Sequence, residues 1–166
     1  MNDLAIQLQI HQVSNALTSY QYQKGTITLF LNYTEQIFMP MGQRNIPLPA
    51  YGIYIIYDQN RNFEMLMKSD KKTSVCILTL PINTLHKIIS QGTDELNFTQ
   101  SAIFEKEQYH HFEVASNTIT QCVHEVVSNP ENQLLREAKK YAILDDYFNA
   151  SRRQTKYQCP FLNQKE

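Results

Sequence analysis

The sequence predicts a mainly β protein with α-helices, an antiparallel β-barrel or sandwich followed by two C-terminal helices. Short strand-like runs alternate with turn clusters over the first half of the chain, as they do in barrels and sandwiches. Beyond residue 116 the apolar residues recur at helical spacing instead. With 166 residues, of which 42% are apolar and 19% charged, the chain has the size and composition of one folded domain.

Six runs carry strand signals, which are either apolar–polar alternation or a β-branched and aromatic composition. The first run alternates from Leu4 to His11, and the fourth reads YGIYIIY from Tyr51 to Tyr57. The six runs are 4–13, 18–23, 26–33, 51–57, 63–68 and 73–80, and two weaker candidates are 96–104 and 109–114.

Two connections between these runs have a distinct composition. Lys24-Gly25 lies between the second and third runs, which predicts a tight turn and a hairpin of those two strands. Residues 36–50 contain three prolines and Gly42, which predicts an irregular segment with one short strand.

Three helices are expected. Pro81 opens a short one that ends before Gly92, and Ser116 can cap a second whose apolar residues follow helical spacing. The third and longest is 129–153, where Asn129 can serve as the cap and Pro130 as the first helical residue.

This last helix has apolar residues on two sides. Ile143 and Tyr147 form a small patch beside Arg136, and a broader apolar face with Asp145 near its middle lies opposite. One side can therefore pack on the domain and the other on a partner; the alternative is an ordinary core helix with an uneven apolar face. The candidate dimer interface is Leu134, Leu135, Ala138, Tyr141, Ala142, Asp145 and Phe148.

Charge and cysteine content exclude several classes of protein. A formal net charge of −1 provides no basic field for a nucleic-acid backbone, so this chain is not expected to bind DNA by itself. Three widely spaced cysteines without a Cys-x-x-Cys pair indicate reduced thiols in a cytoplasmic protein. The N-terminus does not resemble a signal peptide, and no run approaches the roughly 20 apolar residues of a membrane span.

Catalytic and metal-binding patterns do not stand out. The four glycines do not form a phosphate-binding loop, and the five histidines include no His-x-His pair of the kind that binds metal in cupins. Cys122 and His124 diverge by about 200° on a helix, so they do not form a thiolate–imidazole pair. We therefore expect neither an enzyme, nor a metal site, nor a cofactor.

A ligand pocket inside the β body is the remaining candidate site. A small barrel or sandwich either fills its interior or holds one ligand, and tyrosine and methionine suit both roles. These residues are equally compatible with an ordinary core. The candidate pocket residues are Phe30, Tyr33, Tyr54, Ile56, Phe63, Met65 and Met67.

The C-terminal third resembles the segment that links the two domains of AraC-type bacterial transcription regulators, in particular the siderophore-responsive PchR-like branch. Glu137-Ala138-Lys139 with Leu144 is similar to a helix of that family, and Cys-Pro-Phe-Leu at 159–162 is similar to the motif before its DNA-binding part. The run at 20–25, YQYQKG, is a weaker likeness to the same branch.

The resemblance implies an organisation and a function. Residues 1–115 would form a cupin-like effector-sensing body, 116–153 a helical hairpin for homodimerisation, and 154–166 the start of a linker to a DNA-binding domain absent from this chain. The expected partners are a second copy and a small-molecule effector, with DNA bound only through the missing domain and no membrane. The alternatives are a small cupin-type enzyme and a structural dimerisation module with a filled barrel.

Overall fold

The computed structural model describes residues 6–92 and 107–148, with the backbone alone for 88–92. The weaker strand candidate at 96–104 and the motif at 159–162 lie outside these residues.

Five antiparallel strands form the main sheet in the order β1-β8-β3-β6-β9. Each pairs with its neighbours through a continuous register that brings distant parts of the chain together, such as Leu8 with Leu78 and Tyr54 with Phe112. The strands are β1 (Gln7–Val13), β8 (Thr73–Pro81), β3 (Thr26–Asn32), β6 (Gly52–Asp58) and β9 (Gln108–Val114).

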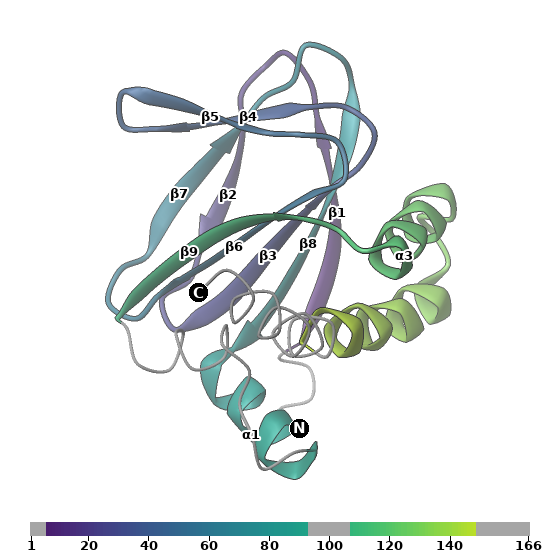
Figure 1. Cartoon of the computed structure of the whole chain (residues 1–166). Coiled ribbons are helices and arrows are strands. Elements are labelled where there is room, and N and C mark those ends of the chain that lie inside the picture. Colours follow the sequence, from purple (N-terminus) through teal and green to yellow (C-terminus); the bar gives the residue numbers. More distant parts are fainter. Residues whose placement is uncertain (1–5, 93–106, 149–166) are drawn as a thin grey trace, which may run out of the picture.

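Two smaller sheets form a second layer over one face of this sheet (Figure 1). One pairs β2 (Thr18–Tyr22) with β7 (Phe63–Met67), and the other pairs β4 (Ile37–Met41) with β5 (Arg44–Leu48). Phe38 and Lys68 join the two sheets by reciprocal backbone hydrogen bonds of 2.7 and 2.9 Å. The predicted fold class is confirmed, and of its two forms the protein adopts the sandwich rather than a closed barrel.

The hairpin predicted at Lys24-Gly25 is wrong. The turn itself is present, with Gly25 at a φ of 79° and the Thr26 amide donating to the Gln23 carbonyl at 3.2 Å. The strands on either side nevertheless belong to different layers, because β2 pairs with β7 while β3 lies between β8 and β6. The turn signal sets the change in chain direction but not the partner of each strand.

The irregular segment predicted at 36–50 is also wrong, because it is the β4–β5 hairpin. Gly42, at a φ of 62°, allows the turn between the two strands. Pro40 and Pro47 lie inside these strands. A two-stranded sheet tolerates them because each strand has a side that needs no amide donor.

Helices follow the strands on the outer face of the main sheet. α1 (Ile82–Gly92) and α3 (Asn117–Ser128) correspond to the first two predicted helices, and the Ser116 side chain caps α3 by accepting from the Ile119 amide at 3.1 Å. The last described helix covers 133–148 and is here named the final helix.

The predicted start of the final helix is wrong by three residues. Asn129 is instead the C-cap of α3, where its amide donates to the carbonyls of Glu125 and Val126. Asn132 caps the final helix by accepting from the Leu135 amide at 3.0 Å. The Asn-Pro pair thus begins the turn between the helices, and residues 149–153 of the predicted helix lie outside the described residues.

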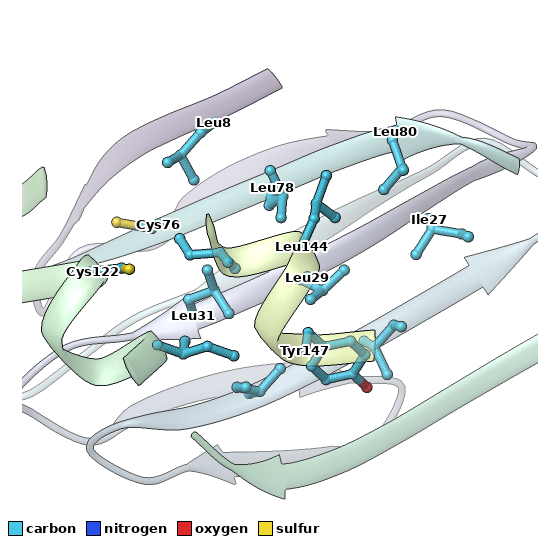
Figure 2. Packing of buried hydrophobic residues seen from close by; sticks show 14 of the residues in the cluster. Leu8, Ile27, Leu29, Leu31, Cys76, Leu78, Leu80, Cys122, Leu144 and Tyr147 are labelled. Atoms are coloured by element: carbon cyan, nitrogen blue, oxygen red, sulfur yellow. The ribbon is translucent and has the colours of Figure 1, made fainter. Parts of the chain in front are cut away.

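Two apolar cores lie on opposite faces of the main sheet. The outer core joins the sheet to the helices, and Figure 2 shows Leu29, Leu78 and Leu144 packed together within it. The inner core lies between the main sheet and the second layer. Its buried members are Val13, Tyr22, Phe30, Ile37, Met39, Leu48, Tyr54, Ile56, Met65, Met67, Val75 and Ile77.

Candidate functional site

The inner core is the candidate site, and strand alternation determines which side chains enter it. Phe30 on β3 pairs with Ile77 on one side and Tyr54 on the other, and Tyr54 pairs with Phe112 on β9. Paired residues of antiparallel strands point to the same face. A row of large side chains therefore crosses the inner face of the sheet.

Aromatic rings form a continuous series through this row. Phe112 stacks on Tyr54 with ring centroids 4.3 Å apart, and Tyr54 stacks on Phe30 at 6.0 Å. Tyr20 from the second layer meets Phe30 edge-on at 5.7 Å, and His11 meets Tyr20 at 5.8 Å. Phe112 is 37% exposed and Tyr54 is buried, so the series connects the solvent at β9 with the interior.

The second layer adds adaptable side chains and one fixed anchor. Met39, Met65 and Met67 are buried in the inner core, and unbranched methionine changes shape easily. Tyr22 stacks on Phe63 at 4.6 Å, and its hydroxyl accepts from the Asp58 amide at 2.6 Å. Burial raises the pKa of Tyr22 to about 12, so its hydroxyl remains protonated and fixes this end of the interior.

Three polar groups of the inner face are the uncharged hydroxyls of Thr28, Thr73 and Tyr20, and the imidazoles of His11 and His110 lie at its edges beside Tyr20 and Tyr54. Thr28 and Thr73 are buried, and neither hydroxyl has a hydrogen-bond partner of normal geometry. Burial raises the pKa of Tyr20, and the neighbouring hydroxyls of Thr28 and Thr79 offset part of that rise. Burial also raises the pKa of Tyr54. These hydroxyls can therefore donate or accept hydrogen bonds without carrying charge.

The structure brings six of the seven candidate pocket residues together in the inner core, and Tyr33 is the exception. Tyr33 packs against the outer core, and its hydroxyl lies 2.6 Å from Nδ1 of His124 on α3. Because Phe30 and Tyr33 are an odd number of residues apart, one strand cannot direct both to the same face. Strand alternation in the sequence therefore already predicted that Phe30 and Tyr33 lie on opposite faces of the sheet.

β9 connects the inner core to the final helix, a link that the sequence analysis missed. Phe112 faces the inner core, whereas the next residue, Glu113, faces outward and accepts from the Tyr147 hydroxyl at 2.7 Å. Beyond β9, Ser116 donates to Asp146 Oδ2 at 2.5 Å. No sequence motif marks these contacts, because they join residues 30 or more positions apart.

The candidate dimer residues are divided between the two sides of the final helix. Phe148 is buried in the outer core, and Leu135 and Ala142 are half-buried. Leu134 is 82% exposed and Tyr141 is 50% exposed, and Ala138 and Asp145 are exposed beside them. The domain is packed mainly against Ile143, Leu144, Tyr147 and Phe148. An apolar strip therefore remains on the surface of this chain.

A buried lysine also joins the final helix to the start of β1. Lys140 Nζ donates to the Ile6 carbonyl at 2.9 Å and lies 2.7 Å from Glu137 Oε1. The adjacent Lys139 pairs with Glu125 of α3 at 2.9 Å. These contacts stabilise the arrangement of the final helix, but their spacing in the sequence does not reveal them.

Other reactive groups form no recognisable site in the described residues. Cys76 and Cys122 are buried free thiols, and burial raises the pKa of Cys76 to about 12, which disfavours the thiolate. Within 6–92 and 107–148, no group of three or more His, Cys, Asp or Glu side chains could hold a metal ion. Over the same residues, no helix is both long and apolar enough to cross a membrane.

Comparison with known proteins identifies the fold. No protein-family model and no curated protein sequence matches the chain. The solved structures of ToxT from Vibrio cholerae do match. An apo variant has a TM-score of 0.58 and 13% identity over 90% of this chain and 56% of that chain. The wild-type protein with bound unsaturated fatty acid has a TM-score of 0.55 and 14% identity over 93% and 57%.

A third ToxT structure, of the P21 crystal form, gives a TM-score of 0.53 at 12% identity over 90% of this chain and 57% of that one. The chain thus spans little more than half the length of these neighbours. At such low identity the likeness establishes the fold alone.

Proposed function

We propose that this chain is the effector-sensing and dimerisation domain of an AraC-type bacterial transcription regulator, located in the cytoplasm. The observation that carries the proposal is the match to ToxT, an AraC-family regulator, over 90% of this chain. The resemblance of residues 137–144 to the helix of such regulators agrees with it. DNA binding would belong to a separate domain of the regulator.

The inner core is the proposed effector site. One ToxT structure contains an unsaturated fatty acid, so a protein that includes this fold binds a small molecule with a long apolar chain. Here the inner core combines aromatic rings, methionines and unpartnered hydroxyls. Ligand sites have this character, being mostly apolar with a few polar groups that orient the ligand. We propose that the methionines move to admit the effector.

β9 provides the proposed route from the effector to the dimer. An effector that displaces Phe112 would move the same strand that bonds the final helix through Glu113. The effector can change self-association only by its differential affinity for the two arrangements, typically by about 1–3 kcal/mol. The exposed strip at Leu134 and Tyr141 is the proposed interface.

The PchR-like assignment is a narrower part of the proposal. It rests on sequence likeness, of which Glu137-Ala138-Lys139 and Leu144 lie on the final helix. The ToxT match carries no information about a siderophore effector. A siderophore is therefore one member of the ligand panel below rather than the proposed effector.

The test combines ligand screening with measurement of self-association. The 166-residue chain is screened by thermal shift against fatty acids, siderophores, sugars and aromatic metabolites, and each hit is examined by sedimentation equilibrium. We expect a reversible dimer whose dissociation constant changes with the hit. A chain that binds no compound would be a structural dimerisation module. Bound metal with turnover of a hit would instead identify a cupin-type enzyme.

The proposed route has its own variant. Tyr147→Phe removes the bond to Glu113 without altering the inner core, so we expect retained binding but a weaker effect of the ligand on self-association. Tyr57→Phe is the matched control, since Tyr57 is a buried tyrosine of the same outer core. Equal coupling in both variants would exclude the Glu113–Tyr147 bond from the route.

A further inference from the structure

The buried side chains of the inner core are uncharged, and two histidines lie at its edges, where His11 meets Tyr20 and His110 meets Tyr54. Burial lowers the pKa of His11, which disfavours its charged form. All members of this cluster are aliphatic, aromatic or thioether residues. The buried charged residues of the described chain are Asp58 and Lys140, and both have other partners. Asp58 accepts from the turn at Asn60 and Arg61, whereas Lys140 lies on the final helix beyond the sheet. The two buried charged side chains therefore form their hydrogen bonds with groups outside the candidate site.

Unpartnered hydroxyls occur on the same face. Thr28 is fully buried on the central strand of the main sheet, with Thr79 paired to it on one side and Ile56 on the other. Its hydroxyl lacks a hydrogen bond of normal geometry. The Tyr20 hydroxyl lies close enough to that of Thr28 to lower the pKa of Tyr20, but without forming a hydrogen bond of normal geometry. A buried hydroxyl without a well-formed hydrogen bond is unfavourable, so a ligand that offers a well-aligned partner gains free energy there.

The ring series lies next to this hydroxyl. Phe30 is two residues beyond Thr28 on β3, so both side chains point to the inner face. Phe30 and Tyr54 are stacked with planes 27° apart, and Tyr54 and Phe112 with planes 24° apart. Such faces favour flat apolar rings, which stack on aromatic side chains in the same way.

We infer that the effector is an uncharged molecule with a flat apolar body and a hydroxyl or carbonyl group. Its body lies among Phe30, Tyr54 and Phe112, and its polar group hydrogen-bonds the Thr28 hydroxyl. A carboxylate in this position would lose its hydration without gaining a cationic partner from the cluster. This inference rests on the proposed function and specifies the chemistry of its ligand.

Matched alcohol and carboxylate probes test this chemistry. Benzyl alcohol is compared with benzoate, 2-naphthalenemethanol with 2-naphthoate, and dodecanol with dodecanoate, each by calorimetry at pH 7.5. Because the chain has no tryptophan, the fluorescence of its tyrosines gives a second readout. We expect each alcohol to bind at least about tenfold more tightly than its carboxylate, with 2-naphthalenemethanol tightest.

Thr28→Val locates the bound alcohol. Valine keeps the shape of threonine and removes the unpartnered hydroxyl, so the melting temperature should rise while binding of 2-naphthalenemethanol weakens about threefold to tenfold. Thr34→Val makes the same change at an exposed position and should alter neither quantity. Tyr54→Phe removes the tyrosine hydroxyl of the inner core and tests whether it also binds the alcohol. Tyr57→Phe, on the outer face, is its control.

The outcomes separate this inference from the proposed function. Equal or tighter binding of the carboxylates would overturn the inferred chemistry and leave an effector-binding domain. Alcohol binding that Thr28→Val does not weaken would place the ligand elsewhere and overturn the inferred site. Binding of neither series would overturn the inference alone, because the effector-binding function fails only if the wider panel of siderophores, sugars and other metabolites also gives no hit.

Discussion

The two faces of the main sheet are built from the same five strands but from different kinds of side chain. The outer face is mostly leucine and isoleucine, and side chains of α1, α3 and the final helix pack on it. The inner face carries a row of aromatic rings, and the second layer that covers it adds methionine. Branched aliphatic side chains pack in few rotamers, whereas methionine adapts to irregular spaces.

Polar groups sharpen this difference. On the outer face, Tyr147 bonds Glu113 and His124 meets Tyr33, so these polar atoms have protein partners. On the inner face, Thr28 and Thr73 have buried hydroxyls without partners. Natural domains satisfy nearly all buried polar groups, and exceptions call for an explanation. Arg136 Nε on the final helix is also buried without a hydrogen bond, so the contrast lies in the Thr28 and Thr73 hydroxyls on the face that carries the aromatic rings, where we propose that the effector binds.

The largest contrast is expected on the final helix. Ile143 is fully buried against the outer face, so Ile143→Glu places a charge in the core and should cost more than about 4 kcal/mol of unfolding free energy. Tyr141→Glu changes an exposed residue of the same helix and should leave unfolding within about 0.5 kcal/mol of the wild type. Urea denaturation measures both.

Tyr141→Glu should nevertheless weaken self-association by at least about tenfold, because a charge would be buried in the proposed interface. Leu135→Glu should do the same with some loss of stability, since Leu135 is half-buried. Sedimentation equilibrium measures the dissociation constant. An unchanged constant in both variants would remove this strip from the interface.

A second contrast compares truncations on the two faces. Leu29→Ala leaves a cavity among rigid side chains on the outer face and should cost about 3–5 kcal/mol. Met67→Ala should cost nearer 2 kcal/mol, because the neighbouring Met39 and Met65 can partly fill the space. A larger loss for Met67→Ala, measured by urea denaturation, would show that the inner core is as rigid as the outer one.

The sequence predicted those parts of this comparison that depend on local pattern. Outside residues 36–50, strand signals located the strands, and Ser116 was correctly predicted as the cap of α3. The fold class followed because many short strands followed by helices allow few arrangements. Six pocket candidates share one cluster for the same reason, since alternation directs them to one face.

The remaining features depend on contacts between distant residues. The Lys24-Gly25 turn looks the same whether its strands pair with each other or enter different layers. Asn129 has the chemistry of either kind of cap, and only the fold selects the C-cap of α3. The unpartnered hydroxyl of Thr28 is invisible in the sequence, because its burial results from the packing of two layers.

A smaller effect is expected where the second layer is attached to the main sheet. The Tyr22 hydroxyl accepts from the Asp58 amide and donates to the Thr26 carbonyl, both at 2.6 Å. Tyr22→Phe leaves these backbone groups without that partner and should cost about 1–3 kcal/mol. Hydrogen exchange should accelerate in β7 more than in β8. Equal acceleration in both strands would mean that the two layers open as one unit.

The smallest effect concerns the turn that follows β6 and leads into β7. Burial alone would raise the pKa of Asp58, but hydrogen bonds from Asn60 and Arg61 lower it below its ordinary 3.8. A carboxyl group whose pKa is lower in the folded state stabilises above its unfolded pKa, and that stability is lost as the pH falls through the folded value. Asp58→Asn should therefore cost roughly 1 kcal/mol at pH 7. In urea titrations this difference should shrink below about pH 4. If the difference in unfolding free energy between the wild type and Asp58→Asn is undiminished at pH 3, the loss comes from the geometry of the turn rather than from the charge of Asp58. Acid would then not weaken the link between β6 and β7 through this carboxyl group.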